Sequence, residues 1–264
     1  MTSRLRTERS GAVLRLTLND DATRNSLSEE MLADLQAALD SASADRSIAV
    51  IVLASTGKVF SSGHNLKQLT THRNDPDKGE SYFASVFQTC AHLMTTLARH
   101  RCAIIAEVDG LASAAGCQLV ATCDLAYCSP QASFCTPGVS IGLFCSTPMV
   151  ALSRNLSAKH SMEMLLTGDV VSADFAARVG LVNAVIQHDQ LTTHVTAVAA
   201  KIAAKSQAAI TYGKRAFHEQ RAMSLEDAYA FTSGVMTRNM LDGAACEGLD
   251  AFINRRAPNW PPTT

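Results

Sequence analysis

The feature that most constrains the fold of this chain is a pair of strand-like segments with a helix between them. Residues 48–54, IAVIVLA, form a continuous apolar run, which is typical of a strand covered on both faces. Residues 11–19, GAVLRLTLN, alternate enough to predict a half-buried strand. Between them, Ser28 is a good N-cap for a helix that begins with Glu29 and Glu30 and continues with one apolar stripe. The order strand, helix, strand indicates an α/β protein.

The same kinds of segment recur further along the chain. Residues 83–99 are predicted to form a helix, and residues 103–110 and 124–129 are predicted to form strands. From Ser146 onwards the signals are mostly helical, with one strand, LVNAVI, at residues 181–186. Candidate helix caps in this part are Ser157, Ser172, Ser206 and Ser224 at N-termini and Gly180 at a C-terminus.

We therefore predict two regions: an α/β core over residues 1–195 and a helical region over residues 196–264. The helical region is rich in apolar side chains, among them Ala208, Ile210, Phe217, Leu225, Phe231, Val235 and Met236. A thin set of helices cannot bury so much apolar surface by itself, so packing against another subunit is predicted. Docking of these helices on the core of the same chain is the alternative.

The overall composition excludes several classes of partner. The formal net charge is −1 and the calculated isoelectric point is about 6.7, so neither nucleic acid nor an acidic membrane surface is expected to bind. The chain has no apolar run of about 18 residues and no N-terminal secretory stretch of about 7–15 apolar residues, so we expect a cytoplasmic protein. The eight cysteines form no CxxC pair and no zinc-binding spacing with histidine, which predicts reduced thiols and no metal site.

Two segments rich in small residues are candidates for backbone chemistry. VFSSGHNLKQL at residues 59–69 and GLASAAGCQLV at residues 110–120 each follow a predicted strand, where α/β proteins bind ligands. Small residues at a helix start let a ligand approach free N–H groups, which would stabilise an anionic oxygen. Close packing of a helix on a strand is the alternative explanation. Neither segment matches the common phosphate-binding motifs.

Several segments together resemble the enoyl-CoA hydratase/isomerase (crotonase) superfamily. TRNSLSEEM at residues 23–31 resembles the start of its first helix, and the two small-residue segments resemble its two oxyanion loops. Later landmarks are FCTPGVSIGLF, LLTGDVVSADFAARVGLVNAVI and EGLDAFINRRAPNW, so the resemblance extends over about residues 10–260. It implies an α/β fold built as a crotonase-like spiral of ββα repeats. It also implies a C-terminal helical region that assembles homotrimers, often paired into a dimer of trimers.

The resemblance further implies an acyl-CoA substrate, in which coenzyme A is part of the substrate and no separate cofactor is needed. In this family two peptide N–H groups hold the thioester carbonyl oxygen, and the matching residues are Ser62 and Ala115. A reaction through a thioester enolate places negative charge on that oxygen, and each fixed donor can lower the barrier by several kcal/mol.

Other residues match parts of the family that contact coenzyme A. Asn65 and Leu66 match the loop whose backbone meets the adenine, and Arg24 matches a residue near the phosphates. Arg255 or Arg256 is implied to reach a neighbouring subunit's coenzyme A. Solvated surface charge is the alternative role for each arginine.

The family pattern is broken at both acid–base residues. Hydratases of the family use two glutamates, because hydration of a conjugated double bond needs a base at one atom and an acid at its neighbour. The matching residues are Gln118 and Gly138, and neither can titrate. Efficient hydration is therefore not expected, and double-bond isomerisation loses the acid that it needs at residue 138.

His64 is the remaining candidate for a chemical role beside the thioester. The segment GHN at residues 63–65 is similar to the GHD of the superfamily's methylmalonyl-CoA decarboxylases, where the histidine is proposed to help hold the substrate carboxylate. Decarboxylation needs an oxyanion hole but no strong base. Against this, Cys145 replaces the tyrosine of those enzymes, and His64 could instead bond a loop carbonyl. Three functions stay open: an enolate-forming enzyme that acts as a decarboxylase or a weak hydratase, a non-catalytic acyl-CoA binder, and a structural trimer subunit that binds no coenzyme A.

Overall fold

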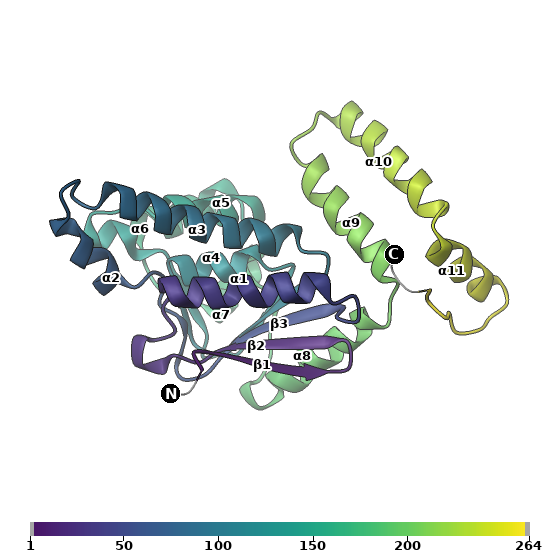
Figure 1. Ribbon diagram of the computed structural model, residues 1–264, viewed down its shortest axis with the longest axis horizontal. Coiled ribbons are helices and arrows are strands. Elements are labelled where there is room, and N and C mark those ends of the chain that lie inside the picture. Colours follow the sequence, from purple (N-terminus) through teal and green to yellow (C-terminus); the bar gives the residue numbers. More distant parts are fainter. Residues whose placement is uncertain (1–2, 262–264) are drawn as a thin grey trace.

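The computed structural model describes residues 3–261, and a six-stranded sheet lies at its centre (Figure 1). In sheet order the strands are β1 (Leu5–Ser10), β2 (Val13–Leu18), β3 (Val50–Ser55), β5 (Ala103–Val108), β7 (Leu125–Cys128) and β10 (Ala184–Val185). β1 pairs antiparallel with β2, and every other neighbouring pair is parallel. The predicted α/β class is confirmed.

A second, smaller sheet follows the first along the chain. Its strands are β4 (Val59–Ser61), β6 (Leu111–Ser113), β8 (Ser133–Cys135) and β9 (Val171–Ser172), with the first three parallel and β9 antiparallel to β8. β3 leads into β4, β5 into β6 and β7 into β8, and a helix follows each pair. This is the ββα repeat that the family resemblance implies, and it brings the segments after β4 and β6 to the same edge of the small sheet.

The core of the described chain contains eight α-helices. They are α1 (Glu29–Ala44), α2 (Leu66–Thr71), α3 (Glu80–Arg99), α4 (Ala115–Thr122), α5 (Ser146–Asn155), α6 (Ala158–Thr167), α7 (Ala173–Val179) and α8 (His188–Ala203). The Ser28 hydroxyl accepts a hydrogen bond from the Met31 amide at 3.2 Å, which caps α1 as predicted. The other predicted caps are also confirmed, at Ser157, Ser172, Ser206, Ser224 and Gly180.

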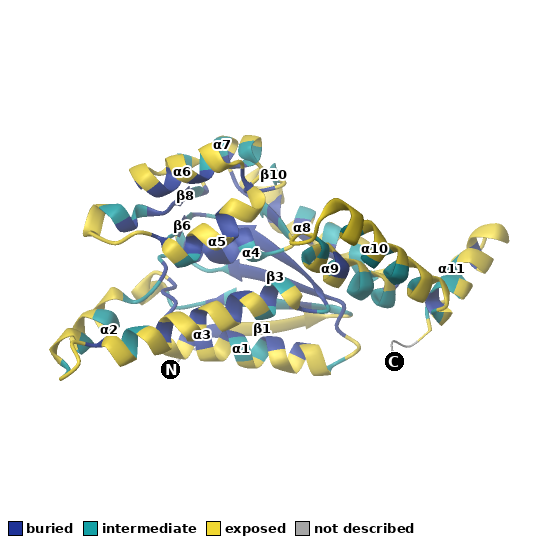
Figure 2. Ribbon diagram, turned by 90° about the horizontal axis from the view of Figure 1, so that it is seen from above, coloured by how far each residue is buried: buried dark blue, intermediate teal, exposed yellow. Residues whose placement is uncertain are grey.

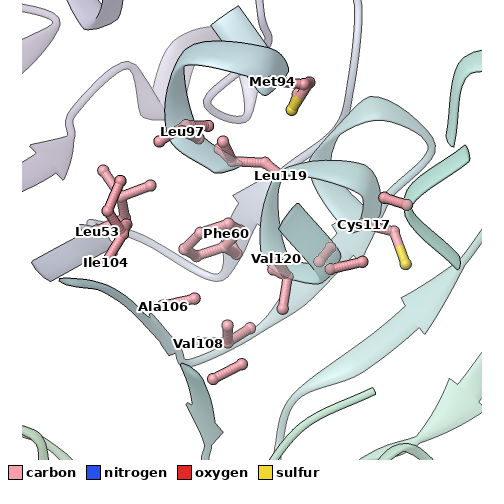
Figure 3. Close-up of a cluster of buried hydrophobic side chains, with 14 of the residues drawn as sticks. Leu53, Phe60, Met94, Leu97, Ile104, Ala106, Val108, Cys117, Leu119 and Val120 are labelled. Carbon is pink, nitrogen blue, oxygen red and sulfur yellow. The ribbon is translucent and has the colours of Figure 1, made fainter. Parts of the chain in front are cut away.

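The β3 strand is buried on both faces, as its unbroken apolar sequence predicts. Ile51 and Leu53 belong to the main core with α1, α3 and α4, whereas Val50 and Val52 pack in a second cluster with α8. Phe60 lies in the main core between the sheet and α4, beside Leu119 and Val120 (Figure 3). Burial of each such side chain contributes about 1.5–3 kcal/mol to the stability of the fold. The two sheets and α4 are thereby fixed against one another.

The last three helices project from this core (Figures 1 and 2). They are α9 (Gln207–Gln220), α10 (Leu225–Met240) and α11 (Gly243–Ile253). The predicted division at residue 195 falls inside α8, whose Val195 is fully buried against the sheet. The helical arm therefore starts after Ala203, where α8 ends. Its large apolar side chains remain exposed, including Leu225, Tyr229, Met236, Leu241, Phe252 and Ile253.

The described part of the chain lacks two features that would indicate other classes of protein. Among residues 3–261, no helix has the length and apolarity needed to cross a bilayer. The same residues contain no group of three or more histidine, cysteine or acidic side chains that could hold a metal ion. All eight cysteines are free thiols, and Cys246 alone among them is exposed.

Candidate active site

The two small-residue loops meet in direct contact. Gly63 has a φ of +82°, and a methyl group added to it would lie 3.1 Å from the Ala115 amide nitrogen and 2.9 Å from the Ser113 carbonyl oxygen. A methyl group added to Gly116 would lie 2.3 Å from the Ser61 carbonyl oxygen. Contacts this short with backbone atoms leave no space for a side chain. The small residues are therefore needed both for the packing of α4 on the loop after β4 and for access to the backbone.

The Ala115 amide is held as a free donor at the start of α4. Ala115 is 1% exposed, and in the described part of the chain no acceptor bonds its N–H. The preceding residue, Ala114, has φ +50° and ψ −116°, a conformation that an L-residue rarely adopts. The Ala114 amide bonds the Cys135 carbonyl at 2.9 Å, and the Ala114 carbonyl accepts from Gln118 at 3.0 Å. These bonds hold a strained turn that directs the Ala115 amide out of the helix, where the helix dipole adds positive potential.

The second predicted donor, the amide of Ser62, requires a correction. This amide donates to the Arg24 carbonyl oxygen at 3.1 Å, so it has no free hydrogen for a ligand. The Gly63 amide faces the Ser61 hydroxyl at 3.3 Å. Within residues 3–261 the next amide, that of His64, has no hydrogen-bond acceptor. The candidate donors at this site are therefore the amides of His64 and Ala115, two residues further along the first loop than predicted.

The His64 side chain lies in an apolar and largely enclosed position. Both ring nitrogens are shielded from solvent and have no hydrogen-bond partner in the described structure, and the ring meets Phe87 edge-on at 5.4 Å between centroids. A loop carbonyl, that of Leu27, acts on the ring without meeting full hydrogen-bond geometry. Burial lowers the pKa of His64, and the backbone of Leu27 opposes that shift without reversing it. The imidazole is neutral near pH 7.

This burial predicts a pH dependence of stability. Because the folded-state pKa of His64 is lowered, the unfolded chain binds a proton there first as the pH falls below about 6.5. Stability contributed by the neutral ring is complete above that pH and is lost as the pH falls towards the folded-state pKa. We expect His64→Gln to change the free energy of unfolding more at pH 7.5 than at pH 5.5, as measured by urea denaturation. An equal change at both pH values would contradict the assignment.

The surroundings of Gln118 and Gly138, which match the two hydratase glutamates, differ from each other. Gln118 is only 4% exposed, and its side-chain oxygen has no hydrogen-bond partner in the described structure. At Gly138, an added methyl group would lie 2.9 Å from Cys145 Sγ and 2.9 Å from the Leu143 carbonyl oxygen. The Cys145 thiol thus fills the space where a side chain at residue 138 would begin. Burial raises the pKa of this thiol, which keeps it protonated and argues against a nucleophilic role.

The residues expected to contact coenzyme A are only partly brought to this site. Asn65 caps α2 through its side chain, which accepts from the Lys67 amide at 3.1 Å, and Leu66 is exposed beside it. Arg24 lies against the first loop through its carbonyl bond to Ser62.

Arg255 and Arg256 lie past the end of α11, on the projecting arm and away from α4 (Figure 1). Arg256 is bound to Glu247 and Asp250 at 2.6 Å each, so its charge is already balanced within the arm. Arg255 is exposed. Within one chain these two arginines do not reach the site.

Sequence reasoning missed an open cavity of about 910 Å³ beside Gln118. Its walls come from α3, α4, α5 and α9, which lie far apart in the sequence. No local motif marks such a cavity, because each helix contributes only a few residues at helical spacing. The arginines that line it give no sequence signal either, because they come from three separate elements.

Three named relatives agree with one another and correct the expected location. Enoyl-CoA hydratase domain-containing protein 3, mitochondrial, from Xenopus laevis is 45% identical over 248 residues, which cover 94% of this chain and 83% of that protein. The rat and human proteins of that name are also called mitochondrial. The predicted cytoplasmic location is thus contradicted. That prediction used the absence of secretory and membrane-spanning segments, and neither feature bears on import into mitochondria.

Solved structures and a family profile complete the comparison. An enoyl-CoA hydratase from Mycobacterium smegmatis is 43% identical and superposes with a TM-score of 0.92, covering 98% of this chain and 99% of that one. Human enoyl-CoA hydratase domain-containing protein 3 superposes equally well, with a TM-score of 0.92, at 39% identity over 98% of this chain and 100% of that one. The fold is therefore the crotonase fold. The profile described as enoyl-CoA hydratase/isomerase matches residues 8–262, and the chain belongs to this family.

Proposed function

We propose that the protein binds an acyl-CoA thioester and holds its carbonyl oxygen between the amides of Ala115 and His64. The observation that supports this most directly is the buried Ala115 amide, which points from the N-terminus of α4 without an acceptor in the described structure. A buried N–H without a partner costs about 1–3 kcal/mol, so its retention favours a ligand oxygen at that point. The contact of Gly63 with Ala115 supports the same site.

The chemistry proposed at this site is the formation of a thioester enolate without acid–base help from carboxylates. Gln118 can orient a ligand or a water molecule, but it cannot take up a proton near pH 7. In a decarboxylation, the bond from the α carbon to the departing carboxylate breaks, and its electron pair moves into the enolate as CO₂ leaves. The enolate oxygen is stabilised by the two amides, and a proton from solvent then reaches the α carbon. The neutral and buried His64 ring favours a chemistry that needs no strong base.

A second candidate is a catalytically inactive acyl-CoA binder. It is favoured by Cys145, whose sulfur occupies the start of the space that the second acidic side chain would need. With both acidic positions changed, the site retains features for binding a thioester but lacks those for ordinary hydration.

One experiment separates these candidates. Purified protein is incubated with crotonyl-CoA and with methylmalonyl-CoA, turnover is followed by absorbance and mass, and affinity for each is titrated. We expect binding of both compounds, at most slow hydration of the first, and decarboxylation of the second. His64→Ala should abolish the decarboxylation, because this variant keeps the amide but loses the ring proposed to hold the substrate carboxylate. Binding without turnover would instead support the inactive binder. Failure of every acyl-CoA, and of coenzyme A itself, to bind would reject the proposed site.

We also propose that the projecting arm associates with other copies of the chain. The exposed side chains of the arm include Leu241, directly after α10, at 80% exposure and Phe252, on α11, at 83% exposure. Apolar surface of this extent on helices that leave the core is typical of a subunit interface.

A measurement of mass in solution tests this proposal. Light scattering is expected to give about three times, or six times, the 28.1 kDa mass of one chain. Leu241→Asp with Phe252→Asp should give monomers, because each places a charge in an apolar interface. The control is Leu66→Asp, which adds a charge at an exposed leucine on α2 and should leave the mass unchanged. A monomeric wild-type protein would contradict the proposal.

A further inference from the structure

The cavity beside Gln118 has walls suited to a hydrocarbon chain. Its volume of about 910 Å³ lies at the upper end of the range for small-molecule sites. Its lining includes the apolar side chains of Met94, Ala98, Ala121, Val150, Ile210 and Phe217. Gln118 belongs to the same wall, and its buried side-chain oxygen has no partner in the described structure. One wall of the cavity is therefore formed by α4, the helix that begins at Ala115.

Three guanidinium groups from different elements line the same cavity. Arg99 ends α3, Arg154 lies on α5, and Arg221 follows α9. Among residues 3–261, none of the three has a carboxylate within 4.0 Å. Arg154 bonds the Val150 carbonyl of its own helix at 3.0 Å, and Arg221 bonds the Arg154 carbonyl. These bonds hold the side chains in position without balancing their charge.

The other ionisable groups of the cavity do not supply the missing negative charge. Asp124 is its one acidic residue, and Lys214 binds that carboxylate at 2.7 Å. The Lys214 side chain is 8% exposed and also donates to the Leu97 and Cys102 carbonyl groups. Burial lowers the pKa of His218, and Lys214, Arg221 and Arg99 lower it further while Asp124 acts in the opposite direction. Arg99, Arg154 and Arg221 are themselves exposed, and no carboxylate of the described chain pairs with them, so all three remain available to an anionic ligand group.

We propose that this cavity receives the acyl chain of the thioester and that its arginines bind a carboxylate at the far end of that chain. The substrate class is then an ω-carboxyacyl-CoA, the CoA ester of a dicarboxylic acid. Apolar walls suit the methylene groups, and a guanidinium group binds a carboxylate through two parallel hydrogen bonds. This inference rests on the proposed function, because it takes the thioester to lie at the Ala115 amide.

Matched ligand pairs test the inference. Succinyl-, glutaryl-, adipyl- and suberyl-CoA are compared by calorimetry with butyryl-, valeryl-, hexanoyl- and octanoyl-CoA, in which a methyl group replaces the terminal carboxylate at each chain length. We expect the dicarboxylic ester to bind at least about tenfold more tightly at one or more lengths. Arg154→Gln and Arg221→Gln should each reduce that difference to less than about threefold, with the affinity for the matched monocarboxylic ester unchanged.

Arg178→Gln is the control variant. The Arg178 guanidinium lies 5.3 Å from the centre of the Phe175 ring, much as the Arg221 guanidinium lies 5.6 Å from that of Phe217, but Arg178 is outside the cavity. Its removal should leave the preference for the terminal carboxylate intact. Melting temperatures of all three variants check that each one is folded.

The remaining outcomes separate this inference from the function on which it rests. Equal binding of both esters at every length would overturn the inference and leave the thioester site intact. A preference that survives both Arg154→Gln and Arg221→Gln would also overturn it, because the charge would then be recognised elsewhere. If no ester and no free coenzyme A binds, the proposed function itself fails.

Discussion

Replacing Gly116 with alanine is expected to destabilise the protein by about 3 kcal/mol or more, although alanine favours helices over glycine by about 1 kcal/mol. The reason is the contact between α4 and β4, where the added methyl group would lie 2.3 Å from the Ser61 carbonyl oxygen and 2.8 Å from Ser61 Cβ. Backbone atoms cannot move aside without disturbing the small sheet. The measurement is the free energy of unfolding in urea, accompanied by the melting temperature.

Gly213 provides the matched control for this substitution. It lies inside α9, and no atom would come within 4 Å of an added methyl group. Gly213→Ala should therefore be neutral or stabilise the protein by up to about 1 kcal/mol. If the two substitutions have the same sign, the close approach of α4 to β4 is not what requires a glycine at residue 116.

A hydratase is expected to emerge only when Cys145 is removed together with the restoration of both acidic residues. Gln118→Glu and Gly138→Glu would supply a general base and a general acid, each of which typically contributes about 10²- to 10⁴-fold to a rate. While Cys145 is present, its sulfur lies 2.9 Å from the point where the new side chain at residue 138 would begin. We expect the variant that also carries Cys145→Ala to hydrate crotonyl-CoA at least about 100-fold faster than the variant that keeps the thiol.

Two control measurements check ligand binding and folding in these variants. The Leu143 carbonyl oxygen also lies 2.9 Å from that point and the Cys145 amide nitrogen 3.2 Å from it, so the exposed segment at residues 140–144 must shift as well when the side chain at residue 138 is added. Titration with coenzyme A checks that each variant still binds the ligand, and urea denaturation checks that each is folded. Equal hydration rates with and without the Cys145 thiol would show that the sulfur does not block the acid.

The sequence predicts the long elements of this fold far better than the short ones. The continuous apolar run at residues 48–54 corresponds to β3, and Ser28 caps α1, because periodicity and capping are local properties. The strands β4 and β6 are three residues long, which is too short for a period of two to be recognised. From their residues alone these strands are therefore predicted to be loops. Only the family resemblance implies a repeating ββα unit.

In the candidate site, too, local sequence patterns do not predict contacts between segments that lie far apart in the chain. Ala115 follows from the small residues around it and from the family resemblance, since both concern the start of a helix. The family resemblance points to Ser62 instead of His64, and no sequence pattern tells which amide of a loop bonds a carbonyl group of another segment. That partner is the Arg24 carbonyl, 38 residues earlier in the chain and in contact only after folding. The arginines of the cavity escaped attention for the same reason, as they come from three separate elements.

Helix α9 has two structural roles. It forms one wall of the cavity, and it is also the first helix of the projecting arm. Any displacement of α9 therefore changes the width of the cavity and the position of α10 and α11 together. Thermodynamic reciprocity then applies: if occupancy of the cavity moves α9 and thereby strengthens self-association by some factor, self-association must raise affinity in the cavity by that same factor. Titrations at low and at high protein concentration would yield different dissociation constants for one and the same ligand.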